Sequence, residues 1–153
     1  MTGTMKMAHH PGILDGLDGT GSDVEWATVE ELRRNAGDQL PTMLLEKYRS
    51  SATAAVRASC VFHATRYSRA ISDAVALGLE ALGDRSKVVR YRACLLLAYS
   101  QQTKVLPALR AALARAPVQS KADVLAAIDA IENRNHHYFV DRDHSGKVKL
   151  NVN

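Results

Sequence analysis

The residues whose types and spacing most suggest a ligand site lie near the end of the chain, in the run Asp141-x-Asp143-x-Ser145-Gly146. Oxygen-bearing side chains at alternating positions followed by a glycine match the first half of a calcium-binding loop. Such a loop also needs a carboxylate at its twelfth position, which is Val152 here. We therefore expect a turn, in which Asp and Ser side chains accept hydrogen bonds from nearby backbone N–H groups and Gly146 adopts a positive φ.

The other residues that could bind a metal or act as nucleophiles are scattered. Three histidines (136, 137 and 144) lie in the tail, whereas Cys60 and Cys94 fall inside predicted helices far from them in sequence. Zinc needs three or four convergent ligands, so we predict no metal site and no cofactor. The chain also lacks a nucleophile motif, a phosphate-binding glycine loop and a paired-carboxylate motif. We expect that it is not an enzyme and that its cysteines are buried thiols.

The last third of the chain places acidic residues on a predicted helix and follows them with two adjacent aromatic residues in the tail. An acidic helix face can mimic phosphates and fill the basic active site of a nuclease, and aromatic side chains are favoured anchors of interfaces. The alternative is an acidic face that is merely solvated. The predicted partner-binding residues are Asp123, Asp129, Glu132, Tyr138, Phe139, Asp141 and Asp143.

Basic residues are more numerous but are mixed with acidic ones along the sequence. The chain has 20 Lys and Arg against 16 Asp and Glu, a formal net charge of +4, and no run of five like charges. Specific nucleic-acid binding is therefore not the leading expectation. Two basic and aromatic runs, Arg66-Tyr67-x-Arg69 and Arg90-Tyr91-Arg92, keep open a basic nucleic-acid-binding protein related to DNA repair. The alternative for these arginines is a solvated face combined with structural contacts.

Two apolar series in the same order, about 33 residues apart, show how these side chains are positioned. Val56-Arg57 opens one predicted helix and Val89-Arg90 opens the corresponding helix of the next unit. Such a period indicates a helical repeat, which builds an extended surface rather than a catalytic pocket. We predict an all-α fold, a short α-solenoid over residues 23–134. Its clearest helices are expected at 52–65, 69–82, 86–99 and 104–115, with a half repeat starting near Val124.

The two ends of the chain differ from the repeats. Residues 1–22, rich in Gly, Thr and Asp, predict a mobile arm, and Thr28-x-x-Glu31 predicts the start of a short helix that ends at Gly37. Residues 135–153 alternate between polar and apolar side chains on both sides of the Asp-His-Ser-Gly turn. This pattern predicts a C-terminal β-hairpin that caps the helical stack.

The segment Asp84-x4-Val89-Arg90-x2-Ala93, followed by Val105-x-Pro107-x-Leu109, resembles the HEAT repeat and, more loosely, the armadillo repeat. The similarity covers residues 51–132. In HEAT proteins such Asp and Arg residues form a ladder between repeats, which implies a pair of Asp84 with Arg57 or Arg90.

The short stack with its histidine-rich tail also resembles the small HEAT-like immunity proteins of contact-dependent and polymorphic toxin systems of bacteria. This second resemblance implies a non-catalytic protein that binds and blocks a cognate toxin domain, in some cases a nuclease. A generic adaptor is the remaining alternative.

The N-terminus MTGTMKMAHHPGILDG has no apolar core of a signal peptide. No apolar stretch approaches the roughly 20 residues that span a bilayer. We therefore expect a cytosolic protein without a membrane partner.

Overall fold

A computed structural model describes residues 15–152, and no residue of this range lies in a β-strand. The α-helices are α3 (Asp23–Ala36), α4 (Leu40–Ser50), α5 (Ala54–Ala64), α6 (Ser72–Ala81), α7 (Lys87–Ser100), α8 (Leu106–Arg115) and α9 (Val118–Glu132). Short 3-10 turns lie at Gly37–Gln39 (η1), Thr65–Tyr67 (η2), Thr103–Val105 (η3) and His136–Phe139 (η4). The all-α prediction is confirmed, whereas the predicted C-terminal β-hairpin is wrong. No helix of the described range has the length and apolar character needed to cross a bilayer.

Local signals set most helix ends. The side chain of Ser86 caps α7 by accepting the Val89 N–H, and Pro107 stands in the first turn of α8, where its missing N–H has no cost. Gly37 ends α3 as predicted and has a positive φ of +55°, but its ψ of −127° lies outside the left-handed helical region. The start of α3 is earlier than predicted, because Ser22 and not Thr28 is the N-cap residue.

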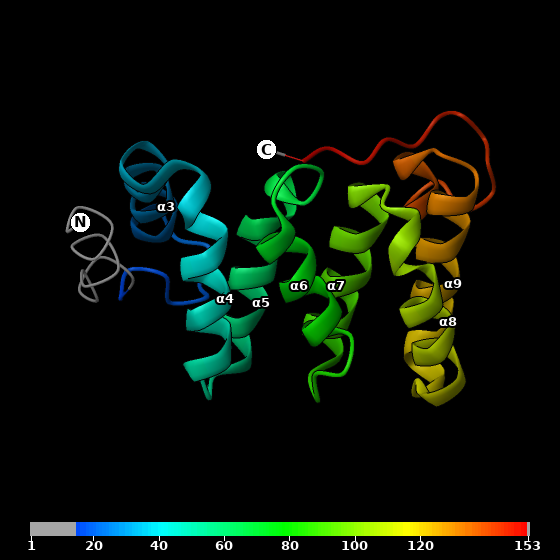
Figure 1. Cartoon of the computed structure of the whole chain (residues 1–153), viewed down its shortest axis with the longest axis horizontal. Helices are drawn as coiled ribbons and strands as arrows, with labels where there is room; N and C mark the ends of the chain where they lie inside the picture. Colours follow the sequence, from blue (N-terminus) through cyan, green and yellow to red (C-terminus); the bar gives the residue numbers. More distant parts are fainter. Residues whose placement is uncertain (1–14, 153) are drawn as a thin grey trace.

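The helices stack in two layers (Figure 1). In one layer α5 packs against α7 and α7 packs against α9, and in the other α4 packs against α6. The second layer is interrupted after α6, since α8 packs on α9 and makes only sparse contact with α6 and α7. The stack is therefore continuous through α5, α7 and α9, and open between α6 and α8.

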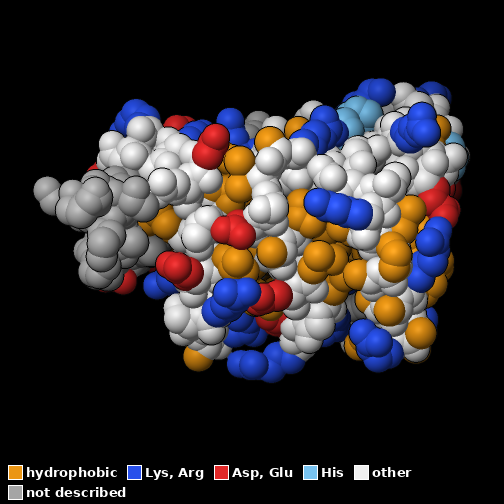
Figure 2. All heavy atoms as spheres, viewed as in Figure 1, with side chains coloured by type: hydrophobic (Ala, Val, Ile, Leu, Met, Phe, Trp, Pro, Cys, Tyr) orange, Lys and Arg blue, Asp and Glu red, His pale blue; other side chains and the backbone are white. Residues whose placement is uncertain are grey.

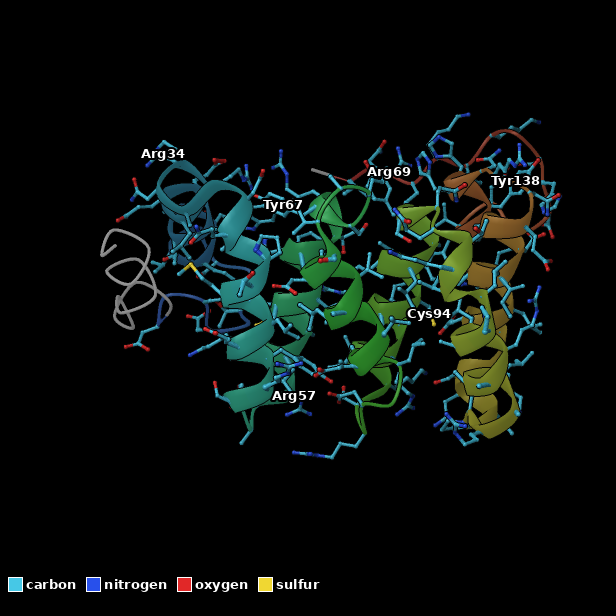
Figure 3. The ribbon with its side chains drawn as sticks, viewed as in Figure 1. Arg34, Arg57, Tyr67, Arg69, Cys94 and Tyr138 are labelled. Carbon is cyan, nitrogen blue, oxygen red and sulfur yellow. The ribbon has the colours of Figure 1, made fainter. Side chains whose placement is uncertain are left out.

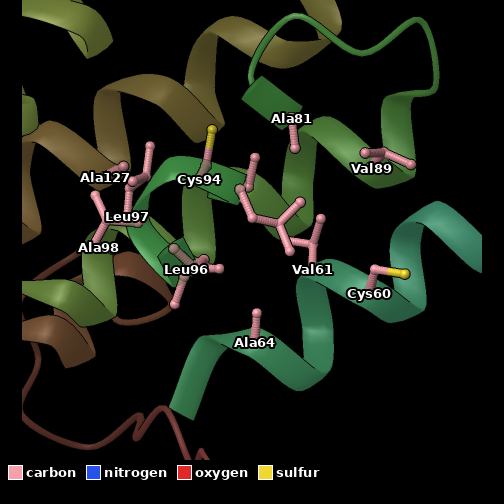
Figure 4. Packing of buried hydrophobic residues seen from close by; sticks show 14 of the residues in the cluster. Cys60, Val61, Ala64, Ala81, Val89, Cys94, Leu96, Leu97, Ala98 and Ala127 are labelled. Atoms are coloured by element: carbon pink, nitrogen blue, oxygen red, sulfur yellow. The ribbon is translucent and has the colours of Figure 1, made fainter. Parts of the chain in front are cut away.

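Small side chains allow the continuous layer to pack closely (Figure 4). Ala64, Ala98 and Ala127 are fully buried on α5, α7 and α9, together with Leu96 and Leu97. On α6, Gly78 lies against α7 so closely that an added Cβ would stand 2.6 Å from Leu96 Cδ2. The apolar stripes of the predicted helices are expected to form the core, and these positions are buried at Cys60, Val75, Val89, Ala93, Leu96, Leu109, Val124, Ile128 and Ile131. The stripes are only partly buried at Val56, Ile71, Leu79, Leu82 and Leu113.

A buried ion pair joins the repeats, as the Asp–Arg ladder predicted. Asp84 accepts from Arg57 Nε at 2.9 Å and Nη2 at 3.1 Å, with side chains 5% and 6% exposed. The Tyr48 hydroxyl and the Ser86 N–H also donate to this carboxylate. In the next repeat Arg90 donates instead to the Asp84 carbonyl and to the Ser120 hydroxyl. A single carboxylate thus ties α4, α5 and the loop before α7 together.

The C-terminal segment folds back over the stack instead of forming a hairpin. The buried carboxylate of Asp141 accepts from the Ser145 N–H, the Ser145 hydroxyl and the Gly146 N–H, and Gly146 has φ of +79°. This confirms the predicted Asp–Ser–Gly turn. Beyond it the chain is extended, and the Leu150 N–H donates to His137 Nδ1 at 2.9 Å. The bond that holds this segment therefore ends on a side chain, and no strand ladder forms.

Of the predicted arm, residues 1–14 lie outside the described range. The remainder, 15–22, packs on the stack through Leu17, which is 1% exposed.

Candidate partner-binding site

The carboxylates of α9 that were predicted to bind a partner are all engaged within the chain. Asp123 pairs with Arg142 at 3.0 Å, Asp129 with His144 at 2.7 Å, and Glu132 with Arg110. The first two partners come from the C-terminal segment, so this acidic face also anchors the tail. Arginines compensate the charge of Asp123 and Glu132, which weakens the expected resemblance to a row of phosphates.

The remaining predicted site residues are divided between core and surface. Phe139 is completely buried against Tyr91, and Asp141 is 3% exposed within its turn. A surface anchor at Phe139 is therefore inconsistent with its position. Tyr138 is half-buried and stacks on the His144 imidazole at 3.7 Å between ring centroids, and Asp143 is exposed. The fold does not bring the seven residues together as one open surface.

The two basic and aromatic runs also separate in the fold. Arg69 lies in the turn between η2 and α6 and stacks on Tyr99, with 4.0 Å between guanidinium and ring centroid. Arg90 belongs to the contacts between repeats, and the Arg92 guanidinium stands 4.7 Å from the Phe62 ring centroid. They do not form the single patch that the sequence suggested.

A surface groove lies between α6 and α8, with a volume of about 590 Å³. One wall comes from α6 and the loop after it, and the other wall comes from α8. The floor comes from α7 and α9 and includes Cys94 and Val124. Figure 2 shows apolar side chains gathered in this region, and Cys94 is labelled at its base in Figure 3. The lining residues used below are Leu79, Leu82, Arg85, Ala108, Ala111, Ala112 and Arg115.

The small side chains of α8 explain why the groove stays open. The positions that face it are Ala108, Ala111 and Ala112, which are too short to reach across to Leu79 and Leu82. Burial of these groups in a filled groove would contribute about 25 cal/mol per Å² of apolar surface. The groove therefore offers an unfilled apolar surface that the predicted core assignment of Leu79 and Leu82 had missed. The alanine run on α8 was the available sequence signal.

The charges around the groove are unequal. Arg85 and Arg115 line it, and their side chains make no hydrogen bond or ion pair with any described residue. Glu80 on the same wall is neutralised by Arg49, and the Asp84 carboxylate is neutralised by Arg57. The groove thus combines an apolar floor with two uncompensated positive charges, and it favours an apolar segment that carries carboxylates.

A second feature, a smaller pocket of about 210 Å³, surrounds a buried Glu25–His63 pair. His63 Nε2 lies 2.9 Å from Glu25 Oε2, and the Gly19 and Gly21 N–H groups donate to the other carboxylate oxygen. Burial lowers the pKa of His63 below its ordinary value. Burial raises the pKa of Glu25, but hydrogen bonds from His63 and Gly21 outweigh it and leave that pKa lowered.

This pair has a structural role. It holds the chain before α3 onto α5. Glu25 was not identified from the sequence, although Ser22-x-x-Glu25 is a capping pattern that could have shown it.

Metal ligation and thiol chemistry find no support in the described residues. No group of three or more His, Cys, Asp or Glu side chains there could hold a metal ion. Both cysteines are free and buried, and burial raises the pKa of Cys60 and of Cys94 to about 12. Neither thiol is poised as a nucleophile at neutral pH.

Comparison with known proteins does not identify a relative: no family model, curated protein or solved structure matches the chain.

Proposed function

We propose that this chain is a non-catalytic protein-binding module and that the groove between α6 and α8 is the binding site for its partner. The observation that carries the proposal is the open apolar floor beside two uncompensated arginines, Arg85 and Arg115. Interfaces commonly combine a buried apolar centre with charged groups at the rim. A solenoid presents such a surface on a rigid frame.

The occupant we propose is an amphipathic helix of the partner. Its apolar face would contact Leu79, Leu82 and the α8 alanines, and carboxylates at one end would pair with Arg85 and Arg115. Helix-in-groove recognition places apolar anchors at helical spacing into such a depression. Arginine is well suited to the charged end because its guanidinium can hold a carboxylate through two bonds.

The most specific form of this proposal is an immunity protein that occludes a toxin domain. It rests on the resemblance of the short stack and its histidine-rich tail to HEAT-like immunity proteins and on the groove as a site for stoichiometric binding. The acidic residues of α9, which the sequence favoured as the contact, take second place because they are paired within the chain. The generic adaptor differs only in the identity of the partner.

Two substitutions on α8 test the groove directly. Ala111→Trp places an indole in the groove, and Ala114→Trp places the same side chain on an exposed position of the same helix that does not line it. Each tagged variant is used to capture partners from source-cell extract, and binding to any purified partner is then measured by calorimetry. The product of the preceding gene is tested first, because a toxin gene directly precedes the gene of its immunity protein.

The proposal expects one stoichiometric partner that is retained by the wild type and by Ala114→Trp and lost with Ala111→Trp. Retention by both variants would overturn the groove as the binding site. Inhibition of the captured protein's toxic activity would establish the immunity role, and a captured partner without such activity would favour the adaptor.

A further inference from the structure

The fold gathers positive charge along one edge of the stack, where α5, α7 and α9 end. We define the basic edge as Arg66, Arg69, Lys104, Arg134, Lys147 and Lys149. None of these six forms an ion pair with a carboxylate among the described residues. Figure 2 shows Lys and Arg side chains along this upper edge, and the extended C-terminal segment that carries the two lysines runs across it in Figure 1.

Hydrogen bonds fix the parts of this edge to one another. Arg69 Nε donates to the Tyr99 carbonyl at 2.8 Å, and Arg69 Nη2 lies 2.9 Å from His136 Nδ1. The Gln102 side chain donates to the Arg69 carbonyl at 3.1 Å. The bond from Leu150 to His137 holds the tail against η4. The cations therefore stand on a connected frame, although their segments are far apart in sequence.

The nearby carboxylates do not neutralise the edge. At the end of α9, Glu132 pairs with Arg110 and Asp129 is hydrogen-bonded to His144, and neither carboxylate forms an ion pair with any of the six cations. The arginine with the most contacts, Arg69, bonds to a carbonyl and a histidine nitrogen and keeps its full charge. Among the exposed large apolar side chains only Val148 belongs to these segments. A protein interface would need an apolar centre that this edge does not have.

We propose that the basic edge binds the phosphate backbone of a nucleic acid. Repulsion among six uncompensated cations is relieved by a polyanion, and release of condensed counterions supplies the driving force. Adjacent helices lie about 8–10 Å apart, so the edge from α5 to α9 spans about 16–20 Å. One strand carries a phosphate about every 3.4 Å along a duplex axis, which gives about five or six phosphates over this length. The number of cations and the length of the edge agree.

This inference is independent of the groove, and charge-matched variants separate the two. The edge variant is Arg66→Gln, Lys104→Gln and Lys147→Gln, which takes one cation from each of three segments. The control variant is Arg85→Gln, Lys87→Gln and Arg115→Gln, which removes the same charge from exposed residues outside the basic edge. All six positions are exposed, so both variants are expected to fold, which circular dichroism checks.

The assay is fluorescence anisotropy with three labelled probes of about 20 nucleotides or base pairs: a single-stranded RNA, a single-stranded DNA and a DNA duplex. Binding is measured between about 50 and about 200 mM salt. With six contacts the slope of log K against log salt is about −4 for single strands and about −5 for duplex DNA. The edge variant should lower the single-strand slope to about −2, and the control variant should keep about −4. The three probes show which form of nucleic acid supplies the phosphates.

Three results would overturn the proposal. The first is no binding at the lowest salt. The second is an equal loss for the edge and control variants, which would show that only net charge matters. The third is equally tight binding of poly-glutamate, which would show a general surface for acidic chains.

Discussion

Removing the Asp84 carboxylate tests the central packing argument most directly. Asp84→Ala deprives Arg57 of its bonds at 2.9 and 3.1 Å and leaves the Tyr48 hydroxyl and the Ser86 N–H without their acceptor. Because the Arg57 and Asp84 side chains are 6% and 5% exposed, water cannot readily replace these bonds. Breaking a buried pair in this way costs about 3–5 kcal/mol. That is a large part of the 5–15 kcal/mol that holds a typical domain folded.

The chain supplies a matched control in the exposed pair of Arg49 and Glu80, whose side chains are 57% and 37% exposed. This pair also joins α4 to α6, and Glu80→Ala should cost only about 0–1 kcal/mol, as exposed ion pairs do. Urea unfolding followed by circular dichroism measures both, with unchanged m values as the sign of an intact two-state transition.

Two further variants, Arg57→Ala alone and Arg57→Ala combined with Asp84→Ala, complete a double-mutant cycle. The double variant should be destabilised by less than the sum of the two single variants, because neither charge is then left alone in the interior. If Asp84→Ala costs less than about 1 kcal/mol, no more than the exposed control, the buried ladder does not stabilise the stack and our account of how the repeats are joined is refuted.

Three further predictions concern the interior. The free energy of unfolding should fall as pH is lowered from about 7 towards about 4. The folded state lowers the pKa of His63 and of Glu25 below their ordinary values of 6.5 and 4.5, so the unfolded chain binds protons more tightly than the folded one. A urea midpoint that is constant or rises on acidification would contradict this. Leu96→Ala should cost about 2–5 kcal/mol in the same urea assay, since its side chain is completely buried against Gly78, and an unchanged melting curve would refute the packing of this face. Cys60 and Cys94 should resist iodoacetamide at pH 8 in the native protein and react fully in urea, because burial raises both pKa values to about 12; rapid native labelling of Cys94 would mean that the groove opens to its floor.

Local signals made the helices predictable. Pro107 and Gly37 fix a helix start and a helix end by their own backbone preferences, whatever the rest of the fold. The start of α3 was misplaced because two capping patterns, Ser22-x-x-Glu25 and Thr28-x-x-Glu31, lie six residues apart. The hydroxyl of Thr28 instead donates to the Val24 carbonyl within the helix. Packing of Leu17 and the bonds from Gly19 and Gly21 to Glu25 select the first pattern, and these contacts depend on tertiary structure.

The C-terminal prediction failed for a related reason. The alternation of Val148, Leu150 and Val152 is typical of a strand, but a strand also needs a partner ladder. Asp141 binds three groups of its own turn, and the Leu150 N–H finds His137. In both places a side chain accepts the hydrogen bond of a backbone N–H group that a strand would have paired with another strand. The alternation of polar and apolar residues gives no sign of such bonds.

The candidate surfaces were least predictable, because they arise from what the fold leaves unfilled or unpaired. Nothing in the spacing of Leu79 and Leu82 distinguishes a core position from a groove wall. The distinction comes from α8, whose alanines stop short of them. Likewise, the sequence shows Asp123 only as an acidic residue on a helix face. In the structure its carboxylate forms an ion pair with Arg142.

The interruption between α6 and α8 also has a mechanical consequence. Elsewhere neighbouring units touch through two layers, whereas here the contact comes mainly from α7 against α9 and η4. A joint with one layer of contacts bends more easily than its neighbours, so slow flexing of this chain should be concentrated there, with α8 and α9 moving as one lever. A partner bound in the groove would contact both of its walls and restrict this flexing. Amide exchange should then slow in α9, including on the face of that helix that the partner does not contact.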